Sequence, residues 1–475
     1  MKIFNDYLCR QLKGGGMEIN MGKFVSLAAK ELKELRKIDP RLISYNVEMT
    51  EVTGGTFWKA YTPEQIAGTE QVPPPDFSKG LGAMHQWYDP IDTTNPRLIK
   101  LAKELGSAWV RVSGTWATKT YYDFEDTGVV PEGYQNRLTK EQWINLLTFV
   151  KAVDGKLLIS VANCEGLHSA SEPWNPSQAE LLFKLSEEHG VPVDAVEFTN
   201  EPNMMEGTGF PKGYTPADFR RDQDLFHKWV RENYPNVLIV GPCTCDPSAM
   251  RGDDEDASGG AGIADILPSC TTFDLMDGCS EKLDVFSYHY YNGVSERMAA
   301  MCPDMFTPAS EATSESYLGM AGLCARAFAP YRDKYCPGGD MWVTESGDAG
   351  AGGHTWASTY LEVPRELNEF AEFATVTNGV IFHNTLASSD YGYLKHGTFD
   401  PRPSYFAALL WKQLMGNVVY DSGITISEGA HVYAHSRKDG KDGLDENDEI
   451  PVMKSVKEKA GTVELAPGSC TFFVI

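Results

Sequence analysis

Residues 195–203 read AVEFTNEPN, in which a short run of strand-forming residues leads directly into the polar sequence Asn200-Glu201-Pro202. A helical pattern follows at 216–233, where Thr215 and Pro216 have the residue types typical of a helix start. The same order recurs along most of the chain, with a short apolar run followed by a longer segment of helical period. This alternation decides the fold class.

Eight runs have the composition of parallel strands covered on both faces, being short and nearly continuously apolar or β-branched. They lie at 42–48, 108–112, 157–162, 195–199, 237–240, 283–290, 341–344 and 379–383. Helical patterns separate or follow them at 95–105, 140–153, 178–189, 216–233, 313–335, 360–375 and 403–415. Eight such units close a (β/α)8 TIM barrel of the α/β class. An open doubly wound sheet shares the alternation, but no glycine-rich phosphate loop follows the first strand.

The sequence changes character after Gly416. Residues 417–475 contain short alternating runs around a charged turn, which predicts a small C-terminal antiparallel β-sandwich domain. These runs read NVVYD, ITIS, HVYAH, EIPVM, TVEL and CTFFVI. Part of residues 1–40 could complete this domain, although residues 24–36 have a helical pattern. We therefore divide the chain into an N-terminal extension at 1–40, a catalytic barrel at 41–416 and the β domain at 417–475.

Composition excludes several classes of protein. The chain has 475 residues, with 66 acidic against 42 basic side chains and a net charge of −24, so an extended nucleic-acid interface is not expected. No apolar run of about 18 residues predicts a membrane span. The ten cysteines have no zinc spacing, and we expect free thiols, no metal and no cofactor. The first residues lack the apolar core of a secretory signal, which predicts a cytoplasmic protein or a secreted one that has lost its leader.

Two glutamates fall at the carboxyl ends of predicted strands, where barrel enzymes carry their reactive residues. Glu201 follows the fourth strand, and Glu345 follows the seventh in the sequence Thr344-Glu345-Ser346. The alternative is that both are exposed turn residues. Two facing carboxyls suit glycoside hydrolysis, in which one protonates the leaving oxygen and the other attacks the anomeric carbon. A separation of about 5–5.5 Å would indicate retention through a covalent glycosyl-enzyme.

The chain resembles the clan-A retaining glycoside hydrolases and, within them, the heparanase and β-glucuronidase group, family 79. The resemblance extends from about Leu42 to Ile475. It is carried by the segments Tyr45–Glu48, Val110–Thr115, Thr199–Asn203, Ser287–Gly293, Trp342–Gly353 and Phe399–Pro401, and by the closing TFFVI.

This resemblance implies a role for each residue of the candidate site. Glu201 would be the general acid/base and Glu345 the nucleophile, and Asn200 would hydrogen-bond the sugar 2-hydroxyl. His289 and Tyr291 would orient the nucleophile and line the sugar subsite. Asn46 and Glu48, at the end of the first strand, would also contact the substrate.

The resemblance further implies a uronic acid as the sugar. Its carboxylate would be held by backbone N–H groups of Gly352 and Gly353 and by Tyr391, while Trp116 could stack on a sugar face. The loop departs from the family pattern because it reads Gly-Ala-Gly-Gly-His, and Ser113 stands where the family usually has glycine.

These expectations favour a retaining, exo-acting β-glucuronidase of carbohydrate metabolism whose partner is a small glycoside ending in a uronic acid. An endo-acting heparanase-like enzyme is less consistent with the acidic chain, because no basic cluster is found in the predicted rim loops. A retaining β-glucosidase or β-xylosidase remains open, as do a non-catalytic carbohydrate-binding barrel and an interaction protein recruited through the β domain. The sequence leaves the oligomeric state open.

Overall fold

A computed structural model describes residues 2–5, 23–205, 208–245, 269–388, 390–424, 431–437, 462–465 and 469–472 of the chain. The runs predicted at 449–453 and 473–475, and most of that at 424–427, lie outside the described residues.

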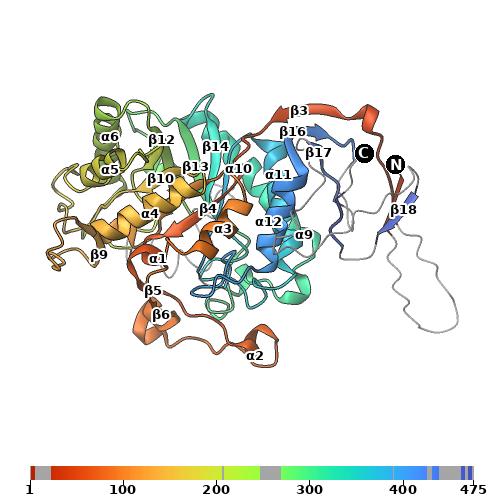
Figure 1. The fold of residues 1–475 in the computed structure, drawn as a ribbon, viewed down its shortest axis with the longest axis horizontal. Coiled ribbons are helices and arrows are strands. Elements are labelled where there is room, and N and C mark those ends of the chain that lie inside the picture. The colour runs from red at the N-terminus through yellow and green to blue at the C-terminus, as the bar shows by residue number, and fades with distance from the viewer. Residues whose placement is uncertain are drawn as a thin grey trace.

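Eight parallel strands form a closed barrel, which confirms the predicted TIM fold (Figure 1). Neighbouring strands pair in register, as in the pairing of Ile159 with Val196 and of Val196 with Ile239. In chain order the barrel strands are β4 (Ile43–Glu48), β7 (Trp109–Ser113), β10 (Lys156–Ser160), β11 (Ala195–Glu197), β12 (Leu238–Thr244), β13 (Val285–Tyr291), β14 (Asp340–Gly347) and β15 (Ile381–His383).

Helices alternate with these strands and surround them. They include α3 (Pro96–Glu104), α4 (Lys140–Ala152), α5 (Ala179–Glu188), α6 (Pro216–Asn233), α10 (Met320–Tyr335), α11 (Glu362–Val376) and α12 (Pro403–Leu414). Each predicted helical segment is confirmed, with one difference at 313–335. There Gly319 ends a short helix, α9 (Glu315–Leu318), before α10 begins, and the Ser314 side chain caps α9.

The barrel interior changes from apolar to polar along its axis. One apolar layer contains Trp109 and Trp342, whose ring centroids are 4.8 Å apart, packed with small and branched side chains from the other strands. Two residues after Trp109 on β7 comes Arg111, which is fully buried and meets Glu197 of β11. This polar layer lies toward the carboxyl ends of the strands, so it underlies the barrel mouth.

Short elements in the loops border that mouth. The strands β5 (Gly55–Trp58) and β6 (His85–Tyr88) pair as an antiparallel ribbon after β4 and helix α1 (Met49–Thr53). The strands β8 (Thr120–Asp123) and β9 (Asn136–Thr139) pair between β7 and α4. Further short elements are α2 (Pro63–Ile66), η3 (Ala117–Lys119) and α8 (Thr272–Met276).

An additional antiparallel sheet joins the two ends of the chain. Strand β16 (Met415–Asp421) lies between β17 (Ala434–Arg437) and β3 (Lys33–Lys37). A three-stranded sheet is formed by β1 (Lys2–Asn5), β2 (Lys23–Ser26) and β18 (Thr462–Leu465). The helical pattern at 24–36 was therefore misleading, because pairing with β16 stabilises β3 in an extended form despite its largely exposed side chains. None of the described helices combines the length and the apolar character needed to span a membrane.

Candidate active site

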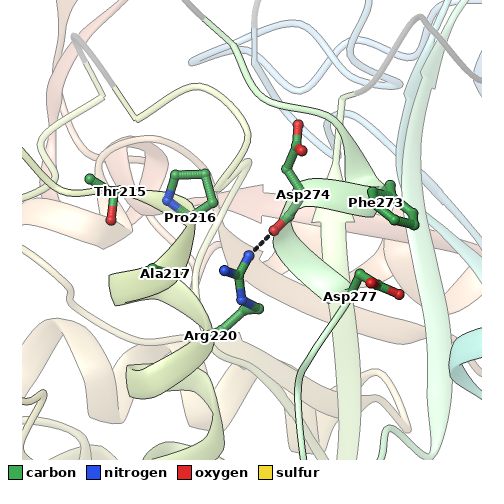
Figure 2. A pocket seen from close by; sticks show the side chains of 7 residues that line it. All are labelled: Thr215, Pro216, Ala217, Arg220, Phe273, Asp274 and Asp277. Carbon is green, nitrogen blue, oxygen red and sulfur yellow. Dashed lines mark hydrogen bonds between the residues drawn. The ribbon is translucent and has the colours of Figure 1, made fainter. Parts of the chain in front are cut away.

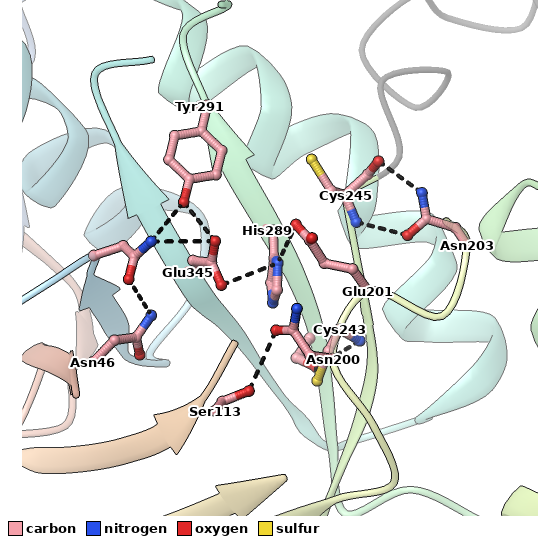
Figure 3. A network of polar contacts seen from close by, with 12 residues as sticks. Asn46, Ser113, Asn200, Glu201, Asn203, Cys243, Cys245, His289, Tyr291 and Glu345 are labelled. Atoms are coloured by element: carbon pink, nitrogen blue, oxygen red, sulfur yellow. Dashed lines mark hydrogen bonds and ion pairs between the residues drawn. The ribbon is translucent and has the colours of Figure 1, made fainter. Parts of the chain in front are cut away.

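Glu201 and Glu345 meet at the barrel mouth although 144 positions separate them in the sequence. One carboxyl oxygen of each glutamate and one ring nitrogen of His289 all lie within 4.8 Å of one another. Glu345 is part of β14, His289 is part of the adjacent strand β13, and Glu201 follows β11, so the carboxyl ends of three barrel strands supply the cluster (Figure 3). All three side chains are buried, which excludes the alternative of two exposed turn residues.

Glu345 is surrounded by hydrogen-bond donors. The Tyr291 hydroxyl donates to its Oε1 at 2.5 Å, and the Asn384 amide donates to the same oxygen at 3.3 Å. Arg111 Nη1 donates to its Oε2 at 3.2 Å and pairs with its charge. Donors and a cation stabilise the ionised form of a carboxyl, so the surroundings suit a carboxylate at position 345.

Glu201 has a different environment. Its backbone φ is +45°, a left-handed conformation that non-glycine residues adopt at strained, often functional positions. His289 Nδ1 lies 3.1 Å from its Oε1. Burial raises the pKa of Glu201 to about 7, with the charge of Glu197 adding to the rise and that of Arg111 opposing it. This carboxyl therefore holds its proton up to neutral pH.

His289 is neutral in this setting, because burial lowers its pKa to about 4. Its Nε2 lies 3.2 Å from Arg111 Nη2, and a guanidinium can only donate, so the ring proton resides on Nδ1. The Nδ1–H group then donates to Glu201. His289 Nδ1 also lies 3.6 Å from Glu345 Oε2, which places the imidazole between the two carboxyls, and its role in orienting the nucleophile stays a prediction.

A buried ion pair supports the site from below. Arg111 donates to Glu197 from Nη2 at 2.7 Å and from Nε at 3.1 Å, and both side chains are fully buried. Ser113 and Cys243 donate to the same carboxylate at 2.8 and 2.9 Å, and Ser160 also contacts it. Arg111 and Glu197 were missed from the sequence. The available signal was a charged residue inside each of two otherwise apolar strands.

The same guanidinium fixes Asn200. Arg111 Nη2 donates to Asn200 Oδ1 at 2.7 Å, and Ser113 Oγ, whose proton is shared with the closer Glu197, lies 3.3 Å from that oxygen. The carbonyl end of the amide is thereby satisfied, which leaves the NH2 end as the group that can donate to a sugar hydroxyl. Ser113, which stands where the family that the chain resembles usually has glycine, is thus part of this hydrogen-bond network.

The turn after Glu201 is tied to the end of β12. Asn203 Nδ2 donates to the carbonyl of Cys245 at 2.8 Å, and the Cys245 N–H donates back to Asn203 Oδ1 at 3.1 Å (Figure 3). Asn203 is buried. These two bonds hold the strained backbone of Glu201 in place from one side.

The remaining predicted residues near β4 and β15 also reach the site. Asn46 Nδ2 donates to Asn384 Oδ1 at 3.3 Å, and Asn384 Nδ2 in turn donates to the Tyr391 hydroxyl at 3.3 Å. Burial raises the pKa of Glu48 well above its usual range, and the nearby charge of Glu345 adds to the effect. A Cβ on Gly114 would lie 1.5 Å from a carboxyl oxygen of Glu48, so this glycine makes room for that side chain. Asn384 was missed, although it follows the eighth strand.

The glycine loop after β14 has left-handed φ values at Ala351, Gly352 and Gly353, of +62°, +90° and +81°. A Cβ on Gly352 would lie 2.6 Å from Cβ of Trp58, and one on Gly353 would lie 3.1 Å from Tyr391. The loop therefore sits beside the predicted tyrosine. The Gly353 N–H donates to the Ala349 carbonyl at 3.1 Å, so it is engaged within the loop. Carboxylate binding here stays a prediction.

Arg297 holds this loop from its other side. Its Nη1 donates to the carbonyls of Ala351 and Gly353, each at 3.1 Å, and its Nη2 pairs with Asp390 at 3.0 Å. The guanidinium stacks 3.7 Å from the ring centre of Tyr61, whose hydroxyl donates to the Gly353 carbonyl. Sequence reasoning did not find Arg297.

Trp116 lies at the rim after β7 and is half-buried. Its Nε1 donates to the Thr56 carbonyl of β5 at 2.9 Å, and the Lys119 ammonium lies 4.2 Å from its ring centre. The structure thus orients the indole by two contacts. Stacking on a sugar stays a prediction.

Across the described ranges, Glu201, His289 and Glu345 form the one cluster whose atoms are close enough to hold a metal ion. Arg111 already supplies positive charge at Glu345, which disfavours a second cation there. A hollow elsewhere is lined by residues of α6 and α8, where Arg220 donates to the Asp274 carbonyl (Figure 2). It contains none of the predicted site residues.

No protein-family profile matches the chain. Among curated proteins, the chain is 23% identical to a heparanase-like protein 1 of Arabidopsis thaliana over 74% of its length. It is also 23% identical to a hyaluronoglucuronidase of Hirudo nipponia and to a baicalin-β-D-glucuronidase of Scutellaria baicalensis, each over 73% of its length. It spans 64%, 71% and 67% of these three relatives, in that order.

Solved structures give a weaker likeness. A 4-O-α-L-rhamnosyl-β-D-glucuronidase of Fusarium oxysporum 12S aligns over 83% of this chain and 76% of its own, with a TM-score of 0.48 and 11% identity. The chain is thus similar in sequence to heparanase-like proteins and glucuronidases, and its closed barrel carries two buried glutamates at the mouth, which supports a glycosidase.

Proposed function

We propose that the chain is a retaining, exo-acting β-glucuronidase that hydrolyses terminal β-D-glucuronides by double displacement. The observation that carries this proposal is the unlike environment of two carboxyls whose oxygens lie within 4.8 Å. Glu201 holds a proton near neutral pH, whereas Glu345 is bound by Arg111 and Tyr291. The short distance between these oxygens supports retention, because inverting enzymes keep their carboxyls about 6.5–9.5 Å apart to admit a water.

In the first step Glu345 attacks the anomeric carbon while Glu201 gives its proton to the leaving oxygen. The glycosidic C–O bond breaks, the aglycone departs as an alcohol, and an ester forms between the sugar and Glu345. His289, which donates to Glu201, keeps this carboxyl oriented during the transfer. Asn200 donates to the sugar 2-hydroxyl, a bond that strengthens in the transition state.

In the second step Glu201 is a carboxylate and takes a proton from water. That water attacks the anomeric carbon, the ester bond breaks, and Glu345 leaves as a carboxylate while Glu201 regains its proton. Arg111 stabilises the departing charge of Glu345 without moving, since Glu197 already holds it in place. Two inversions give a product of unchanged anomeric configuration.

The choice of sugar rests on the glycine loop, on Tyr391 and on the names of two relatives, which are glucuronidases. The net charge of −24 favours a small substrate over a long polyanion and an exo over an endo action. A neutral sugar is the second candidate, because the Gly353 N–H is engaged by the Ala349 carbonyl.

The test compares 4-nitrophenyl β-D-glucuronide, β-D-glucoside and β-D-xyloside with the wild type and the Glu345→Ala variant. We expect turnover of the glucuronide alone, with none in the variant. Proton NMR of the first product formed gives the stereochemistry, and a β-anomer supports retention. Turnover of a neutral sugar only would reject the uronic acid, and an unchanged rate in the variant would reject the nucleophile.

A further inference from the structure

Lys119 is a buried cation whose partner is an aromatic ring. It ends η3 in the loop after β7, and only 9% of its surface is exposed. Its ammonium lies 4.2 Å from the ring centre of Trp116, and within the part of the chain that the structure describes it forms no ion pair. A ring compensates only part of the hydration that an ammonium loses on burial. A buried cation without a counter-ion is therefore a place where an anionic ligand gains binding energy.

The position of Lys119 relates it to the leaving group. The Thr118 carbonyl accepts from the Asn163 N–H at 2.9 Å, and the Thr118 hydroxyl lies 3.2 Å from that of Thr199. Thr199 is two residues before Glu201, so the loop that carries Lys119 is fixed beside the strand end that carries the proposed acid. Gly209, in the segment after Glu201, packs on the lysine stem, since a Cβ there would lie 2.9 Å from its Cδ.

The groups around Lys119 do not neutralise it. Burial, followed by the charges of Lys119 and Arg297, lowers the pKa of His85 to about 4, so this imidazole carries no charge near neutral pH. Burial raises the pKa of Cys164 to about 11, so this thiol is also neutral. Burial lowers the pKa of Lys119 itself, and neither of these two neighbours supplies a negative charge to pair with its ammonium near neutral pH. Distant acidic side chains beyond about 8–10 Å are screened by salt and do not cancel it.

We propose that Lys119, with Trp116 beneath its ammonium, forms an anion subsite on the leaving-group side of the active site, which binds a carboxylate or a sulfate ester carried by the aglycone. The subsite rests on the proposed function, because Glu201 defines the leaving-group side. The indole supplies a flat apolar surface for an aromatic aglycone, and the ammonium supplies a point charge for its acidic substituent. The enzyme is thereby selective for glycosides whose aglycone is itself an acid.

The first measurement uses turnover. We compare 4-carboxyphenyl, 4-sulfooxyphenyl and neutral 4-carbamoylphenyl β-D-glucuronides with wild type, Lys119→Met and the control Lys212→Met, which removes an exposed lysine of a neighbouring loop. We expect the wild type and the control to prefer an anionic aglycone by about tenfold in kcat/KM, the scale of one charge-assisted hydrogen bond. Lys119→Met should lose this preference and keep its rate on the carbamoyl substrate. Whichever anion shows the preference identifies the natural group.

The second measurement needs no turnover and separates the two proposals. Quenching of tryptophan fluorescence measures the binding of two free anions, 4-hydroxybenzoate and phenyl sulfate. Neutral 4-hydroxybenzamide is the control ligand, and Lys119→Arg is the variant that keeps the charge. Binding of an anion that is about tenfold tighter in wild type and Lys119→Arg than in Lys119→Met supports the subsite even if no glucuronide is cleaved. The subsite is overturned if the wild type binds the anion and the amide equally tightly. It is also overturned if the wild type and Lys119→Met bind the anion equally tightly. Either result counts even if glucuronides are cleaved.

Discussion

Replacing Arg111 by methionine should lower both the stability of the barrel and its activity, and a second substitution at Glu197 should restore the stability alone. Arg111 and Glu197 are fully buried and joined at 2.7 Å, so the variant leaves Glu197 inside the barrel without its cation. Removing one partner of a buried ion pair typically costs about 3–5 kcal/mol, which raises the unfolding equilibrium constant roughly 100- to 5,000-fold. Three further donors, among them Ser113 and Cys243, moderate this loss, which places it at the lower end of the range.

The double variant Arg111→Met, Glu197→Gln removes the unpaired charge as well as the cation. The glutamine oxygen can still accept from the Ser113 and Ser160 hydroxyls, and its NH2 group can donate to the Cys243 sulfur. Replacing a whole buried pair is often nearly neutral. We expect it to recover stability to within about 1–2 kcal/mol of the wild type. Its turnover should stay as low as that of the single variant, because Glu345 and Asn200 have both lost the guanidinium that holds them.

Urea unfolding followed by tryptophan fluorescence gives the stabilities, and release of 4-nitrophenol gives the activities. Lys228→Met is the control, since its ion pair with Glu232 is exposed and contributes at most about 1 kcal/mol. The reasoning is refuted if Arg111→Met loses less than about 1 kcal/mol, or if the double variant is no more stable than the single one. Recovery of turnover in the double variant would show instead that Arg111 acts only on the fold.

Four further results are expected. Because burial raises the pKa of Glu201 to about 7, kcat/KM should fall tenfold per pH unit above 7, and a flat profile to pH 9 would contradict the acid role. The folded chain also holds the protons of Glu201 and Glu51, and burial raises the pKa of Glu51 to about 8. Thermal stability should therefore decrease as pH rises from about 4.5 to 8. Melting temperatures at pH 5.5 and 8.5 measure this decrease. Asn203→Ala should slow glycosides with poor leaving groups by about 10- to 100-fold and dinitrophenyl glycosides far less, and an equal loss on both would reject a positioning role. Gly352→Ala should lose turnover because its Cβ meets Trp58, whereas Gly397→Ala, with a similar φ and open space, should lose only about 1 kcal/mol of stability.

The barrel could be predicted because its strands are covered on both faces and therefore read as apolar runs. Strand ends then placed Glu201 and Glu345 at one rim without any contact information. The misread segment at 24–36 shows the opposite case, since β3 is extended only through its pairing with β16 at the far end of the chain. Local pattern does not contain such a partner.

The supporting residues were harder to predict for a related reason. Arg111 and Glu197 interrupt apolar strands, and a sequence does not show that the two interruptions face each other across a barrel. Asn384 had a usable signal, since it follows the eighth strand by the rule that found Glu345. Lys119 had no such signal. A sequence does not show whether a lysine finds a counter-ion in the fold, and within the described residues Lys119 forms no ion pair.

The proposed mechanism needs one protonated and one ionised glutamate, and a shortage of positive charge in the site favours this difference. Around Arg111 the described residues place Glu197, Glu345, Glu201 and Glu48, and the guanidinium contacts only the first two. His289 is neutral and cannot serve as a second cation. Burial raises the pKa of the two carboxyls that Arg111 does not contact, Glu201 to about 7 and Glu48 well above its usual range, and the charge of Arg111 only partly opposes this rise. The roles proposed for Glu201 and Glu345 thus agree with which carboxyl Arg111 reaches. A cation placed next to Glu201 would lower its pKa and would remove the proposed acid at neutral pH.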